Sequence, residues 1–152
     1  MKIIATNRKA HRDYQIFEVY EAGVELKGNE VKSLRTKGCS LEESFGRIEY
    51  NELFLYNLHI PEYEKSFYFK PNPKRTRKLL LHRKEINRLI GLVAQRGFTL
   101  IPLRLYFNEK GIAKVELALA KGKLLYDKRR KLKEEIAEKE TRRALKMFHK
   151  KI

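Results

Sequence analysis

The chain has 152 residues, with 35 Lys and Arg against 19 Asp and Glu, so its formal net charge is +16 at pH 7. This charge favours a nucleic acid as partner ahead of an anionic membrane surface. No apolar run approaches the roughly 20 residues of a membrane-spanning helix, and the polar start does not resemble a signal peptide, so no membrane partner is expected. A lone cysteine, Cys39, excludes an intrachain disulfide and a cysteine-based zinc site, which indicates a reducing, cytoplasmic location.

Five segments show the period-two alternation of β-strands. They cover residues 14–20 with a continuation at 24–27, then 45–50, 53–60, 99–107 and 112–120. The polar pair Asn51-Glu52 predicts a hairpin between the second and third segments, and residues 108–111 predict a turn between the last two. Pro102 predicts a sheet edge or a bulge, since proline donates no ladder hydrogen bond.

Two helices are predicted between these strands. The apolar residues from Ile86 to Ala94 recur at helical spacing, and Gly97 is predicted to close that helix. A shorter helix is predicted over residues 31–37, closed by Gly38. Five or six strands with a long helix between the third and fourth predict a mainly β fold: an OB-like closed antiparallel Greek-key barrel with flanking α-helices and a basic C-terminal tail.

The charge divides the chain into two parts. Residues 121–152 hold 13 Lys and Arg against 5 Asp and Glu, and residues 1–120 hold 22 against 14, so each part has a net charge of +8. We therefore expect a barrel domain at 1–120 and a basic tail at 121–152. The tail consists of good helix formers, but its apolar stripe is thin and broken. Without a partner we expect it to be disordered or a fraying helix.

The densest basic run, residues 127–131, follows Tyr126. It has two interpretations. One is a solvated linker. The other is an electrostatic strip that becomes ordered on RNA, where each neutralised phosphate releases counterions and Tyr126 stacks on a base. Asp127 either orients its basic neighbours or caps a helix.

Two further groups of residues each have a structural interpretation and an RNA-binding one. The loop 71–78 has two prolines and four basic residues, for which phosphate contact is the preferred interpretation over solvation. Glu30 precedes Lys32 and Arg35, and either lies on a surface helix near its positive end or accepts hydrogen bonds from RNA between two phosphate-binding cations. Spacing alone favours the surface helix. His82 is interpreted as a capping or packing histidine.

No catalytic set is visible. The four histidines are scattered, and no Walker, dinucleotide-binding, zinc-protease or CxxC motif occurs. We therefore expect no cofactor, no metal site and no enzymatic activity.

Several motifs in order resemble the SsrA-binding protein (SmpB) family, the bacterial partners of transfer-messenger RNA. The resemblance runs nearly end to end and rests on His11-Arg12-Asp13-Tyr14, Glu21-Ala22-Gly23, Gly28 to Arg35, Asn57 to Ile60, Arg75 to Arg83, Ile101-Pro102-Leu103, Lys114 to Leu119 and Tyr126 to Arg129.

The resemblance implies more than the residues alone. It implies an OB-like barrel with a tail that is unstructured in solution, and binding to the tRNA-like domain of transfer-messenger RNA. It implies that elongation factor Tu carries the complex to a stalled ribosome, where the tail becomes helical in the mRNA channel at the small-subunit decoding centre. The expected protein is a monomeric, non-enzymatic adaptor. The alternative is a basic OB-fold ribosomal protein that binds rRNA.

By position, the resemblance implies three groups of site residues. One lies on the RNA-facing side of the barrel: Glu30, Lys32, Ser33 and Arg35. Another is the family's basic stretch: Arg75, Arg77, Lys78, His82 and Arg83. The third acts on the ribosome: Lys123, Tyr126, Asp127, Lys128 and Arg129.

The chain departs from the family pattern twice. Leu124 replaces a second lysine, and residues 65–73 lack expected Gly-Asn and Asn-His elements. In that loop the aromatic residues 67–69 serve either local packing or base stacking.

Overall fold

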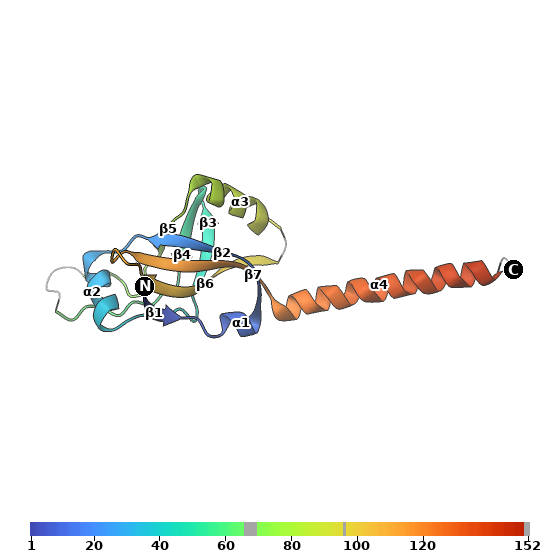
Figure 1. Cartoon of the computed structure of the whole chain (residues 1–152), viewed down its shortest axis with the longest axis horizontal. Coiled ribbons are helices and arrows are strands. Elements are labelled where there is room, and N and C mark those ends of the chain that lie inside the picture. Colours follow the sequence, from blue (N-terminus) through green and yellow to red (C-terminus); the bar gives the residue numbers. More distant parts are fainter. Residues whose placement is uncertain (66–69, 96, 151–152) are drawn as a thin grey trace.

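The computed structural model describes residues 1–65, 70–95 and 97–150, apart from the side chains of 124–128 and 148–150. These residues form seven strands and four helices (Figure 1). In chain order they are β1 (Lys2–Thr6), α1 (Ala10–Asp13), β2 (Tyr14–Val24), α2 (Gly28–Thr36), β3 (Phe45–Glu49), β4 (Glu52–Tyr56), β5 (Arg77–Leu80), α3 (Arg83–Val93), β6 (Phe98–Phe107), β7 (Ala113–Gly122) and α4 (Lys123–Lys150). The aromatic segment 67–69 lies outside the described residues.

A single antiparallel sheet dominates the structure. Its order is β1-β6-β3-β4-β5-β2-β7, and β6 pairs with β7 as well as with β1 and β3. Two long ladders join β7 to its neighbours: with β2, from Tyr14 opposite Gly122 to Gly23 opposite Lys114, and with β6, from Phe98 opposite Lys121 to Phe107 opposite Ala113. The predicted mainly β, antiparallel class is confirmed.

The two faces of β7 pack into two different clusters of apolar side chains. Val115, Leu117 and Leu119 belong to the main core, whereas Ala118 packs in a smaller cluster beneath α1. This is the alternation that period-two patterning predicts for a strand with one face toward the core. Side chains on both faces of β7 are therefore buried, so at this strand the sheet does not have one buried and one solvent-exposed face.

Several predicted boundaries need correction. The predicted strand 53–60 ends at Tyr56, because Asn57 turns the backbone with φ 59. Gly97, predicted to close α3, has φ 93 but lies beyond the actual C-cap at Ala94, next to β6. Gly38 does close α2: it has φ 80 and its N–H donates to Ser33 O at 3.2 Å. The bulge predicted at Pro102 is confirmed by a register shift between Pro102 and Arg104.

Helix α4 projects away from the sheet beyond the end of β7 (Figure 1). It begins at Lys123, because β7 continues to Gly122 and pairs there with Tyr14. The strand therefore includes two residues that the sequence assigned to the tail. Disorder of residues 121–152 in the free protein stays a prediction.

Gly46 provides a test of the packing between β3 and β6. A Cβ at this position would lie 2.9 Å from Leu100 Cβ, whereas a Cβ at Gly28, at the start of α2, meets nothing within 4 Å. Gly46→Ala is expected to lower the free energy of unfolding by about 1–3 kcal/mol through overpacking, and Gly28→Ala to leave it nearly unchanged. Urea unfolding measures both. Equal effects of the two substitutions would contradict the close β3–β6 contact.

Candidate nucleic-acid interface

Glu30 lies at the third position of α2, where its carboxylate closes the helix start. Its Oε1 accepts the backbone N–H of Lys27 at 2.8 Å. This is the reciprocal bond of a capping box, and it places a negative charge at the positive end of the helix. The side chain is only 2% exposed, so the interpretation as a surface residue is wrong.

Two arginines from a distant part of the sequence bind this carboxylate. Arg77 Nε donates to Glu30 Oε2 at 2.8 Å, and Arg75 Nη2 donates to Oε1 at 2.5 Å. The other guanidinium nitrogens of Arg77 donate to Leu58 O at 2.6 Å and Pro73 O at 3.1 Å. Arg77 has no exposed side-chain surface, whereas Arg75 keeps 28%. We call Glu30, Arg75 and Arg77 the buried ion cluster.

The members of the buried ion cluster stay ionised despite their burial. Burial alone would raise the pKa of Glu30, but hydrogen bonds from Arg75, the Lys27 backbone and Arg77 hold that pKa below its usual value. Burial lowers the pKa of Arg77, yet a guanidinium remains protonated over the pH range of a folded protein. A carboxylate and two guanidiniums thus join α2, β5 and the loop before β5.

The other predicted residues of α2 point in different directions. Ser33 is fully buried and its hydroxyl donates to Pro61 O at 2.5 Å. Lys32 and Arg35 are exposed, and lie 5.8 Å from the Tyr63 ring centre and 5.6 Å from the Phe107 ring centre, respectively. Lys32 and Arg35 are therefore the members of this group that are exposed to solvent. Glu30 and Ser33 hold the helix that presents them.

The remaining members of the predicted basic stretch are Lys78, inside β5, and His82 and Arg83, at the start of α3. His82 is the N-cap of α3, and its backbone N–H donates to Glu85 Oε1 at 3.4 Å, which fits the predicted capping position. Arg83 is exposed and donates to Asn51 O at 2.6 Å. Lys78 is half-buried and pairs with Glu52 at 3.1 Å. The stretch is thus divided among the buried ion cluster at α2, the half-buried Lys78 in β5, and the exposed residues His82 and Arg83 at the start of α3.

The predicted tail residues form a third group at the start of α4. Lys123 is half-buried, and the side chains of Tyr126, Asp127 and Lys128 lie outside the described part of the chain. Arg129 packs against the α3–β6 turn: a Cβ on Gly97 would lie 2.6 Å from its guanidinium nitrogen. Among the described side chains, the three predicted groups therefore lie at three separate places: on α2 with the loop before β5, at the start of α3, and at the start of α4.

Sequence reasoning missed a cationic contact at the base of α4. Lys121 Nζ lies 4.3 Å from the ring centre of Phe98 and 5.8 Å from that of Phe17, and these two rings meet edge to face with centres 5.3 Å apart. No sequence signal would have found this contact, since its residues come from three strands. It fixes a positive charge where the sheet meets the helix.

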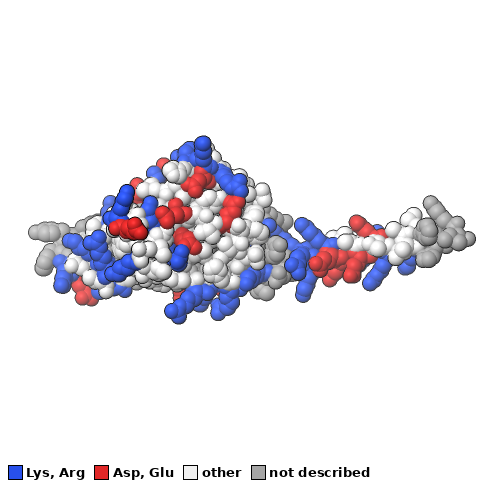
Figure 2. Space-filling model, viewed as in Figure 1, with Lys and Arg blue, Asp and Glu red and all other residues white. Residues whose placement is uncertain are grey.

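Negative charge is also clustered on the sheet. On β2, Glu18 pairs with Arg88 and Glu21 accepts a hydrogen bond from Tyr106; on β7, Glu116 pairs with Arg104. Figure 2 shows acidic side chains near the middle of the visible face, with basic ones toward its edges and at the base of the helix. A polyanion is therefore attracted to the edges rather than to the centre of this face.

Among the described residues, no group of three or more His, Cys, Asp or Glu side chains is arranged to hold a metal ion. Within the same residues, none of the helices combines the length and apolar character needed to cross a membrane.

Comparisons with known proteins agree on one family. A family model described as "SmpB protein" matches residues 4–147. The SsrA-binding protein of Caldicellulosiruptor bescii is 56% identical over 148 residues, which cover 97% of this chain and 93% of that protein. The SsrA-binding protein of Thermosipho africanus is 55% identical over 133 residues, covering 88% of this chain and 89% of that protein.

A solved structure is also similar. It is described as "tmRNA-SmpB: a journey to the center of the bacterial ribosome". The matched chain is 55% identical to this one and has a TM-score of 0.66, with 78% of this chain and 83% of that chain covered.

The buried ion cluster predicts a specific dependence of stability on pH. Glu30→Gln leaves two guanidiniums without their carboxylate, so the free energy of unfolding at pH 7 is expected to fall by about 3–5 kcal/mol. Because the folded-state pKa of Glu30 is lowered, its contribution is present above its usual value of 4.5 and is lost as the pH falls through the folded-state pKa. The stability difference between the original chain and Glu30→Gln should therefore shrink on acidification.

Glu64→Gln is the matched control, because Glu64 pairs with Lys37 at 2.7 Å but is 81% exposed. Its effect on urea unfolding is expected to stay within about 0.5 kcal/mol. An equally small effect of Glu30→Gln would refute the structural role of the cluster.

Proposed function

This chain belongs to the SmpB family of SsrA-binding proteins, and on that premise we propose that it binds the tRNA-like domain of transfer-messenger RNA and delivers that RNA to stalled ribosomes. In this role it acts in trans-translation as a cytoplasmic, monomeric adaptor without catalytic turnover. Elongation factor Tu takes part indirectly, by carrying the charged RNA. The observation that carries the proposal is the 56% identity to an SsrA-binding protein across 97% of this chain.

The sheet is proposed to be the OB-like barrel of this family. The support is the pairing of β6 with β7, which joins β7, at one end of the strand order, back to β6 near the other end. Small closed barrels of this type bind nucleic acids through their loops and exposed strands. Here α2 and the loop before β5 would supply that surface.

RNA binding is proposed to use the exposed cations around the buried ion cluster. Lys32 and Arg35 are open to solvent on α2, and Arg75 keeps part of its surface exposed while it binds Glu30. Phosphate contacts by such side chains supply affinity and fix orientation. Glu30, Ser33 and Arg77 would contribute by position, because their side chains are buried.

The tail is proposed to act on the ribosome rather than on transfer-messenger RNA. Helix α4 carries exposed apolar side chains at Leu132, Ile136 and Leu145, with basic residues between them. A long helix without tertiary packing is marginal in water, so a partner is needed to hold it. The mRNA channel and the small-subunit decoding centre, lined by ribosomal RNA, would be that partner for Lys123, Tyr126, Asp127, Lys128 and Arg129.

A chain truncated after Gly122 tests the proposed division of labour. It keeps all of β7, which a cut at residue 120 would shorten. It is expected to retain most of the affinity for the tRNA-like domain and to lose peptide tagging on stalled ribosomes in a reconstituted translation system. Full tagging by the truncated chain would refute the separate role of the tail.

Lys32→Ala with Arg35→Ala tests the proposed RNA surface. The double variant is expected to bind the tRNA-like domain more weakly and to reduce the slope of log affinity against log salt by about 1 for each phosphate that is no longer neutralised. Arg47→Ala is the control, because Arg47 is exposed on β3 and pairs only locally with Glu49. An equal loss of affinity in both variants would indicate non-specific attraction to a positive protein.

A rRNA-binding structural protein of the ribosome is the alternative. Such a protein would be present in equal number with the subunit from which it is purified, whereas an adaptor would be substoichiometric. Quantitative mass spectrometry of purified ribosomes separates the two.

A further inference from the structure

The turn between β3 and β4 holds an aromatic side chain out in solvent. Glu49 lies opposite Glu52 in the hairpin, so Tyr50 and Asn51 form a two-residue loop. Tyr50 is 95% exposed, more than any other large apolar or aromatic side chain in the part of the chain that the structure describes. A ring that stays in water gains no free energy from burial, so the fold itself gives no reason for an aromatic residue here.

The backbone at this turn favours a different residue from tyrosine. Tyr50 has φ 52 and Asn51 has φ 62. Two-residue hairpin loops with positive φ at both positions prefer Asn, Asp and Gly, and a bulky side chain is strained there. Asn51 fits this preference and Tyr50 does not. Strained backbone of this kind is found mainly at binding and catalytic sites, where the surrounding structure holds it in place.

The start of α3 holds the turn in place. Arg83, the first residue of α3, donates from its Nη1 to Asn51 O at 2.6 Å. This bond fixes the two-residue loop against the helix. The backbone that carries the Tyr50 ring is therefore held beside the first turn of α3, where Arg83 is followed by a second cation, Lys84.

These two cations do not serve the helix that carries them. Arg83 and Lys84 occupy the first two positions of the 11-residue helix α3, where the helix dipole is positive and acidic residues are preferred. Both are exposed, and neither forms an ion pair with a carboxylate among the described residues. Two cations at the positive end of a helix form a region that attracts an anion.

The acidic residues that flank the turn are balanced within the sheet. Glu49 pairs with Arg47 at 3.2 Å, and Glu52 pairs with Lys78 at 3.1 Å. Carboxylates with a cation at this distance repel an approaching anion less than unpaired ones do. The charge that stays unbalanced beside the turn is therefore positive.

An exposed aromatic ring beside two cations selects a ligand that is both flat and anionic. A nucleotide has both properties, because any base stacks on an aromatic ring and each phosphate pairs with a cation. A cationic protein segment would also lie well on a tyrosine ring, but Arg83 and Lys84 would repel it. An acidic segment would suit the cations and leave the ring without a partner.

We propose that Tyr50 stacks on an unpaired base of a partner RNA while Arg83 and Lys84 bind the adjoining phosphates. Stacking tolerates any base, so this site adds affinity without selecting a sequence. The inference rests on the proposed function for its class of partner. Two RNAs would supply the same chemistry: transfer-messenger RNA and ribosomal RNA.

The first experiment is an NMR titration of the full chain, with ¹³C in its tyrosine rings, against an adenine pentanucleotide. Tyr50→Phe assigns the Tyr50 signal. The pentanucleotide is expected to shift that signal upfield, because a stacked base places the ring protons in its ring current. An abasic oligonucleotide with the same number of phosphates is the control and is expected to leave the signal nearly unmoved. Equal shifts with both, or no shift with the pentanucleotide, overturn the proposal.

Tyr50→Asn separates a binding role from a structural one. Because Asn adopts positive φ readily, the variant is expected to unfold at a higher urea concentration than the original chain. Loss of the ring is expected to weaken binding to the RNA that supplies the base by about five- to hundredfold, the range for one stacked base. Tyr50→Phe keeps the ring and should retain the affinity. Ile112→Asn, which removes a 50% exposed apolar side chain beside the β6–β7 turn, is the control and should bind as the original chain does.

Two affinities identify the RNA: that of the full chain for transfer-messenger RNA, and that of the resulting complex for stalled ribosomes. A loss in Tyr50→Asn confined to the first assigns the base to transfer-messenger RNA, and a loss confined to the second assigns it to ribosomal RNA. Unchanged affinity in both overturns the proposal. Failure of the original chain to bind transfer-messenger RNA, with the pentanucleotide still shifting Tyr50, would instead refute the proposed function alone.

Discussion

The fold around α2 depends on one buried carboxylate, that of Glu30. It binds two guanidiniums and a backbone N–H, and Arg77 in turn donates to Leu58 O and Pro73 O. Removing charges from water is costly, and such a cluster is stable only when nearly every donor and acceptor has a partner. Because these partners come from α2, β5 and the segments that precede β5, the cluster fixes how those elements meet.

The same arrangement separates buried charge, which holds the fold together, from charge that is exposed to solvent. The Arg77 guanidinium donates its hydrogen bonds to buried acceptors and has no exposed surface, while Lys32 and Arg35 on α2 stay open to solvent. Rigid presentation matters for an RNA ligand, because phosphate contacts set the register in which the RNA lies. The basic residues at positions 130–146 of α4 are exposed and lack this support, so we propose that a partner orders them.

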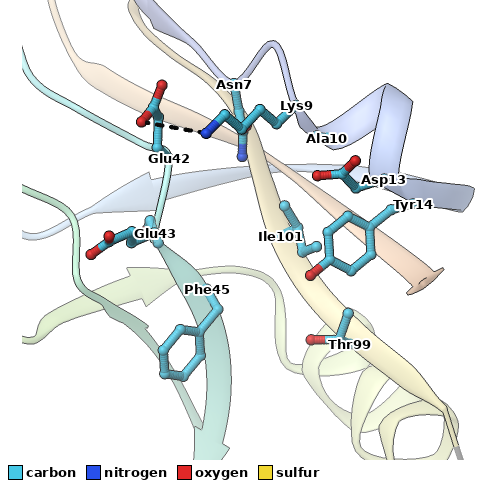
Figure 3. Close-up of a pocket in the computed structure, with 11 residues that line it drawn as sticks. Asn7, Lys9, Ala10, Asp13, Tyr14, Glu42, Glu43, Phe45, Thr99 and Ile101 are labelled. Atoms are coloured by element: carbon cyan, nitrogen blue, oxygen red, sulfur yellow. Dashed lines mark ion pairs between the residues drawn. The ribbon is translucent and has the colours of Figure 1, made fainter. Parts of the chain in front are cut away.

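Sequence patterning predicted the strands and helices whose hydrophobic spacing is visible within the segment itself. It missed those whose burial depends on residues far away in the sequence. The alternation in β7 and the helical spacing in α3 led directly to the observed strand and helix. Strand β5 was missed, because its sequence shows little alternation and its Arg77 is buried by a carboxylate 47 residues away. For the same reason Glu30 was interpreted as a surface residue. The pocket lined by residues from 7–14, 42–45 and 99–101 (Figure 3) also lay beyond patterning, since these three segments are far apart in the sequence.

We propose that the folded body binds one RNA selectively and is not merely a polycation. The most direct measurement compares the affinity of the full chain for the tRNA-like domain of transfer-messenger RNA with its affinity for an elongator tRNA, at near-physiological salt. Clearly tighter binding to the tRNA-like domain is expected, with a preference that persists when the salt concentration is raised. Equal affinities that fall together with salt would contradict the claim, because counterion release alone would then explain the binding.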